Sequence, residues 1–67
     1  MTRTRADDYR QRIAEHERRA AEHDRRAERS DATGDIDERD DERNQAEAER
    51  FAIERLQRLL AELTDNG

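Results

Sequence analysis

The stretch SDATGDIDE, residues 30–38, interrupts a sequence that otherwise has the character of helix throughout. Gly34 suits the left-handed position that follows many helix ends, because it has no Cβ to clash there. Asp35 can cap a following helix, and Glu38, three residues later, completes a pattern like a capping box. The stretch therefore predicts that one helix ends and another begins, with a turn at about residues 32–35.

Both flanks of this turn have the composition of helices. Charged residues make up 49% of the chain and proline is absent, but the abundant residue types (Ala, Arg, Glu, Gln and Leu) are strong helix formers, so helix is favoured over disorder. We expect helices over about residues 5–31 and 36–64, with Thr4 and Asp7 as a weaker cap for the first. The fold class predicted is all-α, a single domain over residues 1–67.

A seven-residue period runs through both predicted helices, as in coiled coils. In the first helix, the repeat places Ala6, Ile13, Ala20 and Ala27 at position a, and Tyr9, His16, His23 and Ser30 at position d. In the second, it places Arg39, Ala46, Ile53 and Leu60 at a, and Glu42, Glu49, Leu56 and Leu63 at d. The seam is therefore polar near the turn and apolar at the far end.

Charges beside this seam favour an antiparallel hairpin over one continuous helix, which is the alternative if a partner straightens the turn. Folding back about Gly34 brings opposite charges together. The expected pairs are Glu17 with Arg50, Asp24 with Arg43, and Arg26 with Glu38.

The same register places His16 opposite Glu49 and His23 opposite Glu42. We interpret these pairs as a polar layer that fixes register and that makes the hairpin sensitive to pH in the range of histidine. These four residues are also the candidates for a metal site. However, the two histidines lie about 10 Å apart along one helix, so such a site would need the glutamates and a second subunit. We expect no metal and no cofactor.

Too few large apolar side chains are present to stabilise a lone monomer. We therefore expect self-association, most simply as a dimeric four-helix bundle, with the chain itself and an unidentified protein as partners. Leu59 widens the apolar stripe beyond the seam, and Phe51 lies away from the seam as an anchor for a partner. The predicted core and interface residues are Tyr9, Ile13, Phe51, Ile53, Leu56, Leu59, Leu60 and Leu63.

Function is constrained mainly by what the sequence lacks. It contains no cysteine, no glycine-rich phosphate loop and no nucleophile paired with a base, so we expect no enzyme and no catalytic residues. No apolar run suits a signal peptide or membrane span, which predicts a cytoplasmic protein that does not enter membranes. The leading hypothesis is a small protein–protein interaction module: an adaptor, an assembly factor or a regulator.

Two alternative functions would depend on charged residues. Arg12, Arg19 and Arg26 form a stripe that could bind nucleic acid, although acidic residues surround it. The run DIDERDDERNQAEAE, residues 35–49, could imitate a polyanion, but its interspersed arginines are more typical of a solvated helix face.

Overall fold

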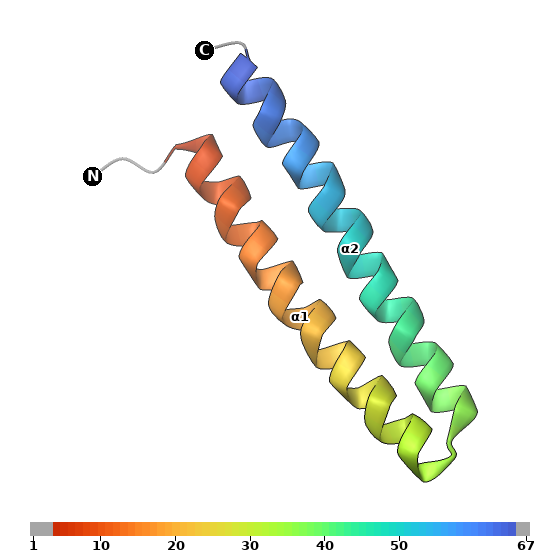
Figure 1. Cartoon of the computed structure of the whole chain (residues 1–67). Coiled ribbons are helices and arrows are strands. Elements are labelled where there is room, and N and C mark those ends of the chain that lie inside the picture. Colours follow the sequence, from red (N-terminus) through yellow and green to blue (C-terminus); the bar gives the residue numbers. More distant parts are fainter. Residues whose placement is uncertain (1–3, 66–67) are drawn as a thin grey trace.

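A computed structural model describes residues 4–65 and places them in two antiparallel helices, α1 (Arg5–Thr33) and α2 (Ile36–Asp65). The helices lie side by side along their lengths and form an elongated hairpin measuring 50 × 22 × 11 Å (Figure 1). The turn closes one end, and the opposite end, which we call the open end, carries the start of α1 and the end of α2. The all-α hairpin predicted from the sequence is confirmed.

Gly34 and Asp35 alone separate the two helices. Gly34 adopts the left-handed conformation (φ 83°, ψ 10°) that its sequence context predicts. The N–H of Asp35 reaches back 2.8 Å to the carbonyl oxygen of Ser30, and the Asp35 carboxylate accepts a hydrogen bond from the N–H of Glu38 at 3.2 Å. One short segment thus satisfies backbone groups at the end of α1 and at the start of α2.

The first helix runs two residues further than the expected end at residue 31. The hydroxyl of Thr33 donates to the carbonyl oxygens of Arg29 and Ser30, and so satisfies acceptors of the last turn. At the other end of α1, Thr4 and Asp7 form a complete capping box, with each side chain accepting from the backbone N–H of the other.

Small side chains close the seam between the helices. Ala27 and Ala46 are 2% and 0% exposed, and Ala20 and Ser30 are also buried. Because alanine lets two helices approach closely, the half of the hairpin nearer the turn excludes water without any bulky side chain. Of the larger apolar residues, Ile13 is the one that the described hairpin buries.

The ion pairs along the seam differ from those predicted. Arg50 contacts Asp24 rather than Glu17, and Arg39 donates to Asp31 at 2.7 Å. Helix side chains lean toward the N-terminus of their own helix, so in an antiparallel pair the side chains of α1 and α2 lean in opposite directions. A long arginine of α2 therefore reaches toward the turn and meets a carboxylate of α1 displaced from its own level. The predicted partners were wrong because they were matched by backbone level alone.

Candidate protein interaction surface

Two histidine–glutamate pairs span the seam at the levels that the heptad register predicts. The Nδ1 atom of His23 lies 2.6 Å from a carboxylate oxygen of Glu42, and Nδ1 of His16 contacts Glu49 in the same way. Since an ionised carboxylate can only accept, each histidine donates through Nδ1. The His23–Glu42 pair is the less exposed, at 15% and 14% of the two side chains. Both pairs therefore join α1 and α2 at matching levels of the two helices, as a polar layer that fixes register would require.

These four side chains do not form a metal centre within the hairpin. Over residues 4–65, no group of three or more potential ligands lies close enough to hold one ion. Each pair offers one imidazole and one carboxylate, and both of these groups are already engaged with each other. What the geometry supports here is a register lock made of hydrogen bonds.

The open end presents the partly exposed apolar surface of the hairpin. Most of the residues that we predicted as core or interface are half-buried there rather than enclosed: Tyr9, Ile53, Leu56, Leu59, Leu60 and Leu63. Leu59 lies at position g of the heptad, beside the seam, and so borders the face on which Leu56 and Ala52 also lie. A single hairpin therefore leaves its richest apolar cluster partly in contact with water.

Phe51 projects from the middle of α2 and is 65% exposed. Beside it lies a groove of about 430 Å³, in which Phe51, Ala52 and Leu56 supply the apolar surface. Arg12 of α1 and Arg55 of α2 border this groove, and His16 reaches it from the seam. The sequence pattern identified Phe51 but missed Arg55, because a groove between two helices depends on side chains from both.

Ile36 is the other large apolar residue with high exposure, at 56%. It opens α2 directly after the turn and is followed by acidic residues in the first helical turn, Asp37 and Glu38. Ile36 was not among the interface residues predicted from the sequence. An apolar residue outside the a and d sites is not buried in the seam, and this signal could have identified Ile36 as an exposed apolar residue.

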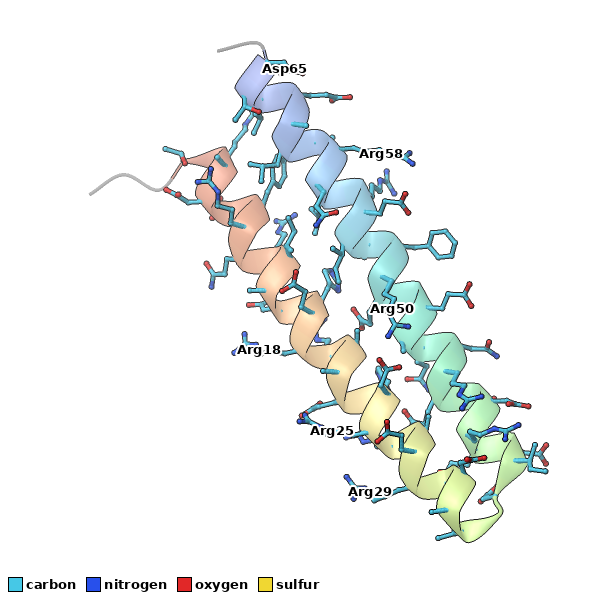
Figure 2. All side chains as sticks on the ribbon, viewed as in Figure 1. Arg18, Arg25, Arg29, Arg50, Arg58 and Asp65 are labelled. Carbon is cyan, nitrogen blue, oxygen red and sulfur yellow. The ribbon has the colours of Figure 1, made fainter. Side chains whose placement is uncertain are left out.

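The arginine stripe of α1 is exposed, as expected for a heptad edge, but it does not form a uniformly basic face. Arg19 shares a surface hollow with Glu15 and Glu22, and Arg12 shares another with Asp8 and Glu15. Three further arginines, Arg18, Arg25 and Arg29, point away from α2 on the outer side of α1 (Figure 2). Basic charge on α1 is thus spread over several directions and mixed with carboxylates, which is unlike a phosphate-binding surface.

Near the turn, Arg39 ties the two helices together. Its pKa is raised above the ordinary value of arginine, chiefly by the hydrogen bond to Asp31; desolvation opposes this effect, and Asp40 raises the pKa further. The guanidinium is therefore charged at any physiological pH. Together with Ala27 and Ala46, this contact closes the seam near the turn, while Ile36 stays exposed outside the seam.

Comparisons with models of protein families, with curated proteins and with solved structures found no match for this chain. Within the described residues, neither helix contains a stretch long and apolar enough to cross a membrane. Evidence for function therefore comes from the surface of the hairpin itself.

Proposed function

We propose that this chain is a non-enzymatic protein–protein interaction module that works as a self-associating helical hairpin, most simply as a homodimeric four-helix bundle. The observation that carries the proposal is the half-buried leucine cluster at the open end, which includes Leu56, Leu59, Leu60 and Leu63. Covering a leucine that is otherwise in water contributes about 1.5–3 kcal/mol when the burial is complete. These leucines are already half-buried in the hairpin, so a second hairpin placed over the cluster would add the remaining part of that free energy, from both copies at once.

The shape of the apolar stripe supports a bundle over a simple two-helix structure. In a two-helix seam, the a and d positions suffice, whereas α2 also carries half-buried Ala52 and Leu59 at position g. Such a widened stripe is typical of helices that contact two neighbours. The role in the cell would be that of an adaptor, an assembly factor or a small regulator, and it would require no catalytic residue.

Light scattering coupled to size exclusion tests the proposal directly. The native chain is expected at twice the mass of one copy, and Leu59→Asp is expected to shift it to the mass of a single copy. Ala61→Asp is the matched control, because Ala61 is exposed, lies two residues away and receives the same new charge. A native chain that stays at one copy up to hundreds of micromolar would refute self-association.

A further inference from the structure

We propose that two copies of the hairpin pack side by side with their turns at the same end, so that α2 of each copy lies against α1 of the other. This inference rests on the proposed self-association and specifies its geometry. The contact face is the one that carries the groove, with Ala52 and Leu59 on α2 and Arg12 and Arg19 on α1. A two-fold axis along the length of the hairpin relates the copies.

The distribution of apolar residues is the first reason for this orientation. Small and polar residues line the turn half of the seam, whereas the leucines lie at the open end. With both turns at the same end, the two leucine clusters meet and cover each other. With the turns at opposite ends, each cluster would face the charged turn half of the second copy, and its burial would be lost.

The arginine stripe supplies an independent reason. If the turns lay at opposite ends, the two-fold axis would place α1 against α1, and Arg12, Arg19 and Arg26 would face the same three residues of the second copy. Like charges placed together across an interface oppose association. With turns at the same end, the stripe instead faces the g edge of α2, which carries Glu38, Gln45, Ala52 and Leu59.

Opposite charges then meet along the flank of the contact. In the hairpin itself, Arg39 of α2 reaches Asp31 of α1. Counted from the His16–Glu49 layer, Asp31 lies five residues nearer the turn than the α1 residue directly opposite Arg39. A second ion pair between the helices, Arg50 with Asp24, is displaced in the same direction, by nine residues. Neighbouring helices of the two copies are also antiparallel, so a displacement in this direction applies between copies, and we use the five-residue offset of Arg39. It pairs Arg55 with Glu15 of the second copy, and Asp41 with Arg29 of the second copy.

These side chains are available for such contacts. Arg55 borders the groove beside Phe51, and Glu15 lines the adjoining hollow that it shares with Arg12. Arg29 points away from α2 of its own copy (Figure 2). A like-charged approach of Asp8 to Glu62 at the outermost level opposes these pairs, so we expect the charges to select orientation while the leucines supply most of the affinity.

Orientation can be measured with spin labels, because the chain contains no native cysteine that would also be labelled. Ala32→Cys places one exposed label beside the turn of each copy. With helices packed roughly 10 Å apart, turns at the same end put the two labels within about 30 Å of each other. Turns at opposite ends of a hairpin 50 Å long separate them by more than about 40 Å.

The outcomes of this measurement are separable. A short distance between copies supports the proposed orientation, and a long distance overturns it while leaving self-association intact. No dipolar signal between copies, in a sample that runs at the mass of a single copy, overturns both this inference and the proposed function.

Charge reversal tests the Glu15–Arg55 contact itself. Glu15→Arg alone and Arg55→Glu alone are each expected to weaken the dimer by about tenfold, since every dimer contains the contact twice. Mixing the two variants, or combining both changes in one chain, restores opposite charges at both contacts and is expected to restore the affinity. Arg25→Glu, an equal change of charge on the outer side of α1, is expected to leave it unchanged. Failure of both the mixture and the double variant to recover would contradict the pairing.

Discussion

The two halves of the hairpin reach their packing by opposite means. Near the turn, Ala27 and Ala46 are almost fully buried and His23 is hydrogen-bonded to Glu42, so small and polar side chains close the seam. At the open end, larger side chains such as Leu56 and Leu60 are only half-buried. Burial therefore does not follow side-chain size in this molecule: two helices alone can enclose alanines, whereas leucines need more neighbours than one helix provides.

The two halves of the hairpin therefore have different roles. The turn half sets the register and is complete within one chain, as its buried side-chain polar atoms over the described residues all have partners. The open half holds the larger apolar side chains, which the two helices of one chain leave half-buried. Substitutions in the turn half should act on the hairpin itself, and substitutions at the open end should act on both folding and association.

The largest effect is expected at the open end. Leu60→Asp places a carboxylate within the apolar cluster, and we expect a loss of about 3 kcal/mol in the free energy of unfolding, with dissociation or unfolding of the protein. Thermal melting followed by circular dichroism and the mass by light scattering measure both consequences. Gln57→Asp adds the same charge at an exposed site of α2 and should change neither. An unchanged melting profile and mass for Leu60→Asp would remove the basis for treating this end as the core.

A somewhat smaller loss is expected from enlarging the turn half. Ala46 is 0% exposed, so Ala46→Leu must push α1 and α2 apart, at a cost of about 2 kcal/mol. Ala48→Leu makes the same change at an exposed position two residues away and should be close to neutral. Urea unfolding of the two variants gives the difference directly. Equal stability of the two would mean that the close approach of the helices at Ala46 is not required.

The parts of this structure that the sequence predicts are those fixed by local signals and by period. Gly34 marks the turn because the left-handed conformation there favours glycine, and the heptad period sets His16 and Glu49 at one level. The d positions of the two helices face each other across the seam, which is why these pairs follow from the register.

The ion pairs and the groove could not be predicted in the same way. The arginine side chain is long and leans along its helix, so Arg50 selects Asp24 according to direction and reach rather than backbone level. The groove beside Phe51 is lined by side chains of both helices, so its border at Arg55 cannot be found from the pattern of either helix alone. Backbone level and the heptad period determine which residues meet in the seam, whereas the ion pairs and the groove on the surface depend on where the long side chains extend.

The smallest effect, and the finest comparison of the two halves, concerns the two histidine–glutamate layers. A double-mutant cycle for His23 and Glu42, with alanine at each position, is expected to give a coupling free energy of about 1 kcal/mol. The corresponding cycle for His16 and Glu49 should give less, because that pair lies nearer the open end and its side chains are 25% and 18% exposed, which allows water to compete. Chemical denaturation at one fixed pH and protein concentration measures all the variants on one scale. Coupling that is equal in the two layers, or larger for His16 and Glu49, would show that the lower exposure near the turn does not strengthen the His23–Glu42 pair.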